Sequence, residues 1–138
     1  KATRILDLTV DYARQRNQFG KSIDKFQMIQ QMLADSAIEI NSARLALLQT
    51  AWEADNDMDV STRISMIKVQ AAETLCRVAD RAVQIYGGLG YCRDLPIERY
   101  YRDARIYRIY DGTSEIHRTI IARAISKGDQ NFYNLNLT

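Results

Sequence analysis

One acidic residue, Asp111, lies among aromatic and basic side chains in the stretch from Arg102 to Arg118. A carboxylate that is held in place and shielded from water becomes more basic, and it can then remove a proton from a carbon atom. Tyr110 and the neighbouring isoleucines could supply this shield. Asp followed by Gly-Thr-Ser-Glu is also typical of a helix N-cap, which is the more common role for this spacing. Both hypotheses stay open at this point.

A glycine cluster, Gly87-Gly88-Leu89-Gly90, is the second candidate for chemistry. It follows a helical pattern, whereas the dinucleotide-binding glycine motif follows a strand, so that type of site is excluded. The end of a helix explains the cluster without any ligand. Glycine also lets a ligand approach the backbone closely, and Gln84, one turn earlier, offers a polar amide on the same face.

A third candidate is Arg16, which together with Arg14 lies between the aromatic residues Tyr12 and Phe19. Guanidinium groups fit the oxygens of a pyrophosphate, and an aromatic ring can stack on a flat base. Basic residues at the end of a helix are also expected because they complement the helix dipole. Spacing alone does not separate the two interpretations.

The elements that must position these residues are helices, because one proline and six glycines leave long uninterrupted segments. No capping residue precedes the first helical pattern, so the chain is expected to begin inside a helix. Asp24 is expected to cap the second helix, with Gln27 in the capping-box position. Apolar residues at spacings of three and four predict helices over 2–18, from Asp24 to about Ala54, from about 60 to Gly87, after Pro96, and from about 113 to Gly128.

These segments predict an all-α fold, an up-and-down four-helix bundle of three long antiparallel helices and a shorter one. A chain of 138 residues is long enough for one domain with a core. We expect this domain to span residues 1–128 and residues 129–138 to form a C-terminal tail. No β-type alternation is evident.

Composition excludes several classes of partner. The charge balance is 19 basic against 17 acidic residues without long blocks of one sign, which does not favour nucleic acid or an anionic membrane. Cys76 and Cys92 have only His117 for company, so no metal site and no disulfide is expected, and no role is predicted for His117. No apolar run approaches the roughly 20 residues that cross a bilayer, and no signal-peptide pattern begins the chain, so we expect it not to be secreted.

Taken together, several motifs resemble the C-terminal helical domain of the acyl-CoA dehydrogenase family in order and spacing, over nearly the whole chain. They are Arg16–Gly20, Phe26-Gln27, Ala82–Tyr91, Pro96–Arg99 and Arg102–Arg118. The resemblance implies a flavoprotein oxidoreductase of fatty acid metabolism that uses FAD to dehydrogenate an acyl-CoA at its α and β carbons. It also implies that this chain is a fragment, inactive alone, which lacks the family's N-terminal and middle domains and the start of the first helix.

The resemblance assigns roles to residues by position. Asp111 matches the catalytic base, and Gly112 and Arg123 match substrate-binding positions. Thr113, Ser114 and Glu115 match the segment beside the chain's own FAD. Residues that match contacts to the ADP part of a partner subunit's FAD are Arg16, Gln18, Phe19, Phe26, Gln27, Gln84, Gly87 and Gly88.

One departure from the family is that the base is usually Glu, which is one methylene longer than Asp111. Relatives of the nitroalkane oxidase type use Asp, so a flavoenzyme of that type is an alternative, as is a helical domain that serves only in assembly. The resemblance further implies a homo-oligomer, a dimer or tetramer, and an electron-transferring flavoprotein as electron acceptor. Bacterial cytoplasm and mitochondrial matrix both fit as the location.

Overall fold

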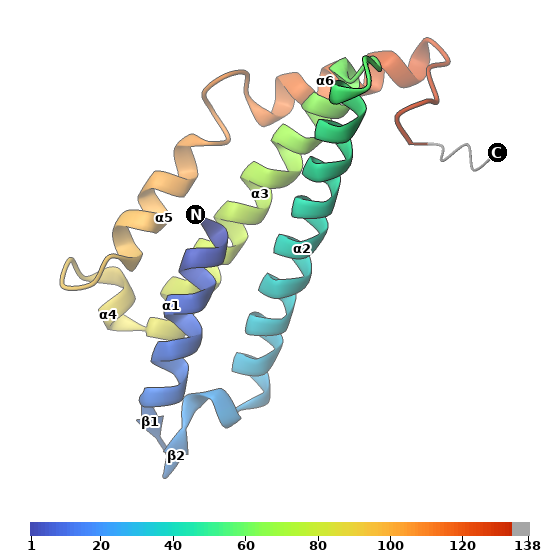
Figure 1. The fold of residues 1–138 in the computed structure, drawn as a ribbon. Coiled ribbons are helices and arrows are strands. Elements are labelled where there is room, and N and C mark those ends of the chain that lie inside the picture. Colours follow the sequence, from blue (N-terminus) through green and yellow to red (C-terminus); the bar gives the residue numbers. More distant parts are fainter. Residues whose placement is uncertain (134–138) are drawn as a thin grey trace.

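A computed structural model describes residues 1–133 of the chain. The prediction of an all-α fold is confirmed, since most of the described residues lie in helices and the described sheet has only two short strands (Figure 1). The helices are α1 (Ala2–Gln15), α2 (Gln27–Asp55), α3 (Ser61–Tyr86), α4 (Gly88–Tyr91), α5 (Ile97–Ile106) and α6 (Ser114–Ser126), with a 3-10 turn at Ile23–Lys25 and two short strands, β1 (Asn17–Gln18) and β2 (Lys21–Ser22).

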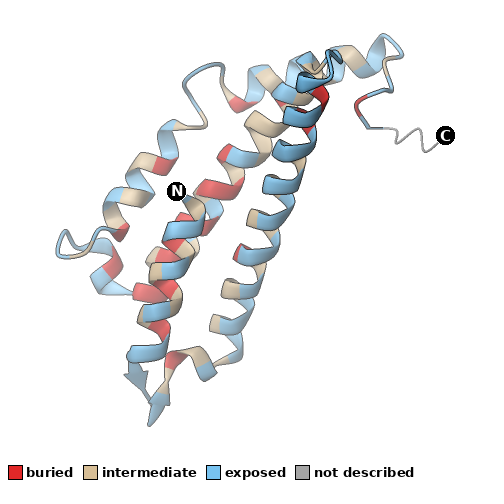
Figure 2. Ribbon diagram, viewed as in Figure 1, coloured by how far each residue is buried: buried red, intermediate tan, exposed pale blue. Residues whose placement is uncertain are grey.

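Helix α3 is the centre of the molecule. It contacts α1, α2, α4, α5 and α6, and Figure 1 shows α1, α2 and α3 running side by side while α6 crosses the end at which α3 begins. Buried residues concentrate on α3, as Figure 2 shows, whereas most of α2 is exposed or half-buried. The segments at the two ends of α3 are therefore attached to the helix that carries most of the buried residues.

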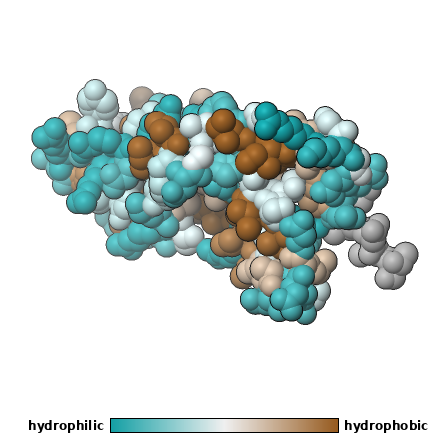
Figure 3. Space-filling model, turned by 90° about the horizontal axis from the view of Figure 1, so that it is seen from above, coloured by the Kyte–Doolittle hydropathy of each residue, from teal (hydrophilic) through white to brown (hydrophobic). Residues whose placement is uncertain are grey.

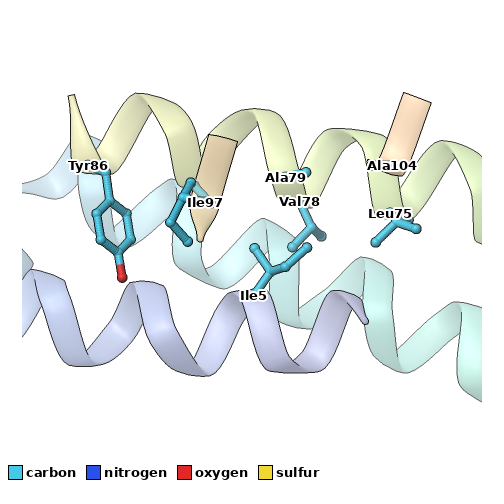
Figure 4. Packing of buried hydrophobic residues seen from close by; sticks show 8 residues of the cluster. Ile5, Leu75, Val78, Ala79, Tyr86, Ile97 and Ala104 are labelled. Atoms are coloured by element: carbon cyan, nitrogen blue, oxygen red, sulfur yellow. The ribbon is translucent and has the colours of Figure 1, made fainter. Parts of the chain in front are cut away.

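The main core joins α3 to α1 and α5. Val78 and Ala79 of α3 are almost completely buried against Ile5 of α1 and Ile97 of α5 (Figure 4). Burying one such branched side chain contributes about 1.5–3 kcal/mol. The remaining members of this cluster are Leu75, Ala82, Tyr86 and Ala104.

One local prediction at the start of α2 is wrong. Asp24 does not cap α2, because the helix begins after Phe26 and has no side-chain cap, and the Asp24 carboxylate accepts instead from the Ser22 hydroxyl at 2.5 Å. The hairpin of β1 and β2 was also not expected. Its strands have two residues each, too few to give an alternating pattern, and its turn places Phe19 and Gly20 at φ of 52° and 81°, as a tight hairpin requires.

An ion-pair network fastens α2 to α3. Glu39 of α2 accepts from Arg81 at 2.8 and 3.1 Å and from Arg77 at 3.0 Å. The hydrogen bonds from Arg81 hold the pKa of Glu39 below its ordinary value of 4.5, and Arg77 adds to this effect. Because folding lowers this pKa, the ion pair contributes its full stabilisation above the ordinary pKa of 4.5. The contribution is lost as the pH falls through the lower pKa of the folded protein.

We therefore expect Glu39→Gln to lower the free energy of unfolding near neutral pH by about 1 kcal/mol, a value at the upper end for partly exposed pairs. The difference from wild type should decrease in urea titrations as the pH falls through the lowered pKa of Glu39, where the carboxyl itself becomes protonated. The matched control is Glu98→Gln, which removes an exposed pair with Arg102 four residues away and should change little. A loss for Glu39→Gln that stays the same as the pH falls through the acid range would contradict the ion-pair explanation.

The predicted tail falls partly within the described residues. Phe132 is buried, and the Asn131 carbonyl accepts from Arg63 at 3.1 Å, so residues 131 and 132 pack against the bundle. Residues 134–138 of the predicted tail lie outside the described part. Among the described helices, none is long and apolar enough to cross a membrane.

Candidate functional site

A large groove lies where the end of α1, the hairpin, the start of α2 and the end of α3 meet. Its volume is about 1020 Å³. Seven of the eight residues that the sequence suggested as contacts to the partner's FAD line it: Arg16, Gln18, Phe19, Phe26, Gln27, Gly87 and Gly88. Gln84, the eighth, is exposed on α3 and is not among the lining residues.

Aromatic packing fixes the walls of this groove. The rings of Tyr12 and Tyr86 stack with their centroids 4.0 Å apart, and the Tyr86 hydroxyl donates to the Leu8 carbonyl at 2.8 Å. Burial raises the pKa of Tyr86, so this hydroxyl keeps its proton. Phe19, which is 93% exposed, meets Phe26 edge to face at a centroid distance of 6.2 Å. One wall therefore presents a nearly bare aromatic surface.

Glycines form the opposite wall at the end of α3. Gly87 ends the helix with φ of 61°, a conformation that side chains with a Cβ disfavour. A Cβ placed on Gly87 or Gly88 would meet no atom of this chain within 4 Å. Space is thus open above both residues, while Gly90, by contrast, packs tightly, since a Cβ there would come within 2.7 Å of Tyr86.

A second site forms around Asp111, in the turn between α5 and α6. Asp111 and the following Gly112 both have positive φ, of 53° and 86°. The prediction that Asp111 caps the last helix is wrong, because Thr113 is the N-cap and its hydroxyl accepts from Ile116 N–H at 3.2 Å. The Asp111 side chain is exposed and remains available for other chemistry.

The Asp111 turn lies beside a cavity of about 380 Å³ between α1, α2, α3 and the end of α5. Lys68, Tyr107 and Tyr110 line it together with Asp111. The predicted shielding is incomplete, because Tyr110 is 41% exposed and the carboxylate itself faces solvent. The described chain thus supplies one wall around the acid.

Two side chains that the sequence did not single out bind the carbonyl groups of this turn. His117 Nε2 lies 3.1 Å from the Asp111 carbonyl oxygen, and its Nδ1 lies 3.1 Å from Ser65 Oγ of α3. Lys68 donates to the Gly112 carbonyl. Asp111 and His117 are only six residues apart, so the sequence could have suggested their contact. The contacts from Ser65 and Lys68 of α3 arise only in the tertiary fold.

The remaining predicted residues lie at different depths. Ser114 is completely buried, and its hydroxyl has no hydrogen-bond partner among the described residues. Glu115 is exposed, and hydrogen bonds from its own backbone and from Thr113 hold the pKa of its carboxyl below the ordinary value. Arg123 is exposed near the end of α6. It lies nine residues after Ser114, a rise of about 13 Å, so the structure does not bring it to Asp111.

Gly112→Ala is expected to destabilise the chain by about 2 kcal/mol for two reasons. Position 112 has a positive φ, which alanine disfavours, and the added Cβ would lie 2.8 Å from His117 Nε2. The matched control is Gly128→Ala, where φ is 82° but the Cβ meets nothing within 4 Å, which should cost only about 1 kcal/mol. Urea unfolding of both variants gives the comparison. Equal losses would show that the contact with His117 is unimportant.

Comparison with known proteins decides the family. Residues 1–126 match the model of the acyl-CoA dehydrogenase C-terminal domain. The chain belongs to the acyl-CoA dehydrogenase family. The resemblance drawn from its motifs is therefore confirmed, and with it membership of a family of oxidoreductases.

Individual relatives and solved structures agree with this assignment. The mitochondrial short-chain specific acyl-CoA dehydrogenase of Mus musculus is 47% identical over 117 residues, which are 85% of this chain and 28% of that protein. Butyryl-CoA dehydrogenase from Megasphaera elsdenii has a TM-score of 0.88 at 36% identity, covering 91% of this chain and 33% of that one. The FAD complex of PigA has a TM-score of 0.87 at 31% identity, covering 91% and 33%. The chain spans about a third of the length of these relatives.

Proposed function

We propose that this acyl-CoA dehydrogenase domain is part of an FAD-dependent enzyme that dehydrogenates an acyl-CoA thioester between its α and β carbons. The observation that carries the proposal is the position of Asp111, an exposed carboxylate beside a cavity, on a backbone turn that side chains of α3 and α6 hold. Family membership supports the class of reaction, and the names of the similar dehydrogenases support the class of substrate.

Asp111 is the proposed base. Its carboxylate takes the α-proton of the acyl-CoA, which the neighbouring carbonyl group of the thioester makes acidic. The backbone N–H of Asp111 donates to the thioester oxygen and stabilises the negative charge that develops there, while the backbone of Gly112 lies beside the bound acyl thioester. Arg123 is proposed to contact a part of the substrate farther from the reacting carbons.

The groove at the end of α3 fits the ADP part of FAD by its chemistry. Arg16 supplies a guanidinium group for the pyrophosphate, Gln18 and Gln27 supply amides, and Phe19 supplies an exposed ring for the adenine. The open space above Gly87 and Gly88 admits a ligand to the backbone. We assign this groove and Gln84 to the FAD of a partner subunit, and Thr113, Ser114 and Glu115 to the surroundings of the chain's own FAD. FAD, when bound, accepts the β-hydrogen as hydride.

The exposed apolar residues of α2 support assembly with other polypeptide surfaces. Leu45, Leu48 and Trp52 are each more than half exposed, and apolar side chains form patches on the face seen in Figure 3. We propose that the enzyme is a homo-oligomer, a dimer or tetramer, and that this chain alone is inactive because Asp111 lacks its other walls. An electron-transferring flavoprotein is the proposed acceptor, and bacterial cytoplasm or mitochondrial matrix the proposed location.

A second candidate follows from the shorter base. Asp111 reaches about 1.5 Å less far than Glu would, and a misplaced base can cost roughly 100-fold in rate. A substrate whose carbon is more acidic, such as a nitroalkane, would tolerate the difference. A domain that serves only in assembly is the remaining alternative, and it requires no function of Asp111.

The proposal is tested by anaerobic reduction of the bound flavin in the longest natural polypeptide that contains this segment. Straight, branched and aromatic acyl-CoA compounds are compared with nitroalkanes. Bleaching by one class of acyl-CoA is the expected result and would also name the substrate. Bleaching by nitroalkanes alone would replace the thioester reaction with the second candidate, and bound flavin that no compound reduces would contradict both.

A further inference from the structure

The backbone conformation at Asp111 needs external support. An L-residue in the left-handed region is less stable than in the right-handed region, so Asp111, with φ of 53°, gains from contacts that hold its peptide in place, whereas Gly112 adopts its positive φ without this cost. The position of the carboxylate relative to the bundle depends on this turn. Whatever holds the turn also sets where the acid points.

His117 makes the direct contact to this backbone. A carbonyl oxygen can only accept, so His117 Nε2, at 3.1 Å from the Asp111 oxygen, must carry a proton. In the neutral ring Nδ1 is then the acceptor, and Ser65 Oγ, at 3.1 Å, donates to it. Ser65 is buried on α3, the central helix. A continuous hydrogen-bonded path thus runs from α3 through the imidazole to the Asp111 carbonyl.

The imidazole also fills the space beside Gly112. A Cβ on Gly112 would lie 2.8 Å from Nε2, so the ring packs directly on the glycine backbone. Lys68 holds the next carbonyl, that of Gly112, from the same helix α3. Glu73 of α3 accepts from Arg108 at 2.9 Å, and the Arg108 carbonyl accepts from Ser114 N–H at 3.1 Å. The turn is therefore attached to α3 at several points, and within residues 1–133 His117 is the side chain that reaches Asp111 itself.

We propose that His117 is a positioning residue for Asp111, which fixes the tautomer of its ring through Ser65 and holds the Asp111 peptide where the carboxylate and the backbone N–H both reach the substrate. The inference rests on the proposed function, because it assumes that Asp111 is the base. It also assigns a role to Ser65, a buried residue on another helix, α3. A glutamine side chain at position 117 can place an amide N–H near the same carbonyl, whereas leucine cannot.

The test measures the rate constant of anaerobic flavin reduction and the apparent Kd of the acyl-CoA in the full-length holoenzyme. His117→Leu should lower the rate constant by roughly 100-fold, as expected for a misplaced catalytic group, with little change in Kd or in flavin content. His117→Gln should recover most of the rate, to within about fivefold of wild type, the cost of one weakened hydrogen bond. Ser65→Ala, a small change that keeps the imidazole, should slow reduction by about fivefold.

The control is Ser126→Ala, which removes a comparable hydroxyl contact to the Ala122 carbonyl on α6, away from the turn. It should leave the rate unchanged. The proposal is overturned if flavin in the His117→Leu variant is reduced at the wild-type rate, or if reduction in His117→Gln is as slow as in His117→Leu. If His117→Leu does not fold, Ser65→Ala decides the question, and an unchanged rate in Ser65→Ala overturns the proposal. Failure of the wild-type enzyme to react with any acyl-CoA is a different result, which rejects the proposed function and the catalytic role of the turn with it.

Discussion

Asp111→Asn is expected to slow reduction of the bound flavin by acyl-CoA by roughly 10³–10⁴-fold, the upper range for removal of a general base. The amide keeps the size of the side chain but cannot accept the α-proton. Because Asp111 is exposed and does not cap α6, the substitution should leave the fold and the flavin content unchanged. Rapid mixing under anaerobic conditions in the full-length enzyme measures the rate.

Asp111→Glu is the informative companion variant. It keeps a carboxylate and extends it by one methylene, so reduction should remain measurable and faster than in the Asn variant. If the Asn variant reduced flavin within tenfold of wild type, Asp111 would not be the base. The domain would then have to contribute through assembly or flavin binding alone.

Arg16→Ala is expected to weaken FAD binding by about 10–100-fold, since a charge-assisted contact to a phosphate contributes about 1.5–3 kcal/mol. Arg16 lines the groove at the end of α3 beside Phe19 and Gly87. Its backbone also ends α1, where Arg16 N–H donates to the Tyr12 carbonyl, and that contact does not depend on the side chain. Titration of the full-length apoenzyme with FAD gives the affinity.

Arg14→Ala supplies the matched control. It removes the same charge two residues earlier, from an exposed position that does not line the groove. A loss of affinity specific to Arg16 supports direct contact with the cofactor. Equal losses in the two variants would reduce the effect to general electrostatic attraction, and the assignment of the groove to FAD would fail.

The helices could be predicted well from the sequence because apolar residues at spacings of three and four report directly on which face is buried. Val78 and Ala82 of α3 belong to that pattern and lie in the core. The start of α2 could not be predicted in this way. Asp24 has the residue type and spacing of a helix cap, but its carboxylate accepts from Ser22 beside a 3-10 turn. The hairpin was missed because strands of two residues carry no periodic signal.

Part of the candidate site could likewise be predicted from the sequence, and part could not. The motif resemblance names most of the residues suggested for the partner's FAD that line the groove, and the stacking of Tyr12 on Tyr86 joins α1 to α3 there. The support of the Asp111 turn was not predicted. One partner of His117, the Asp111 carbonyl, is six residues away, but the other, Ser65, is 52 residues away. Contacts of this kind depend on the packing of α6 across α3, which local patterns do not encode.

The role of Asp111 as the base is tested most directly by exchange of the α-hydrogen of the acyl-CoA with solvent deuterium. Mass spectrometry measures this exchange in the anaerobic full-length holoenzyme. This exchange reports proton removal separately from transfer of the β-hydrogen. The wild-type enzyme should incorporate deuterium at the α carbon, and Asp111→Asn should not, although both bind the acyl-CoA with similar affinity. Undiminished exchange in the Asn variant would contradict the assignment of Asp111 as the base.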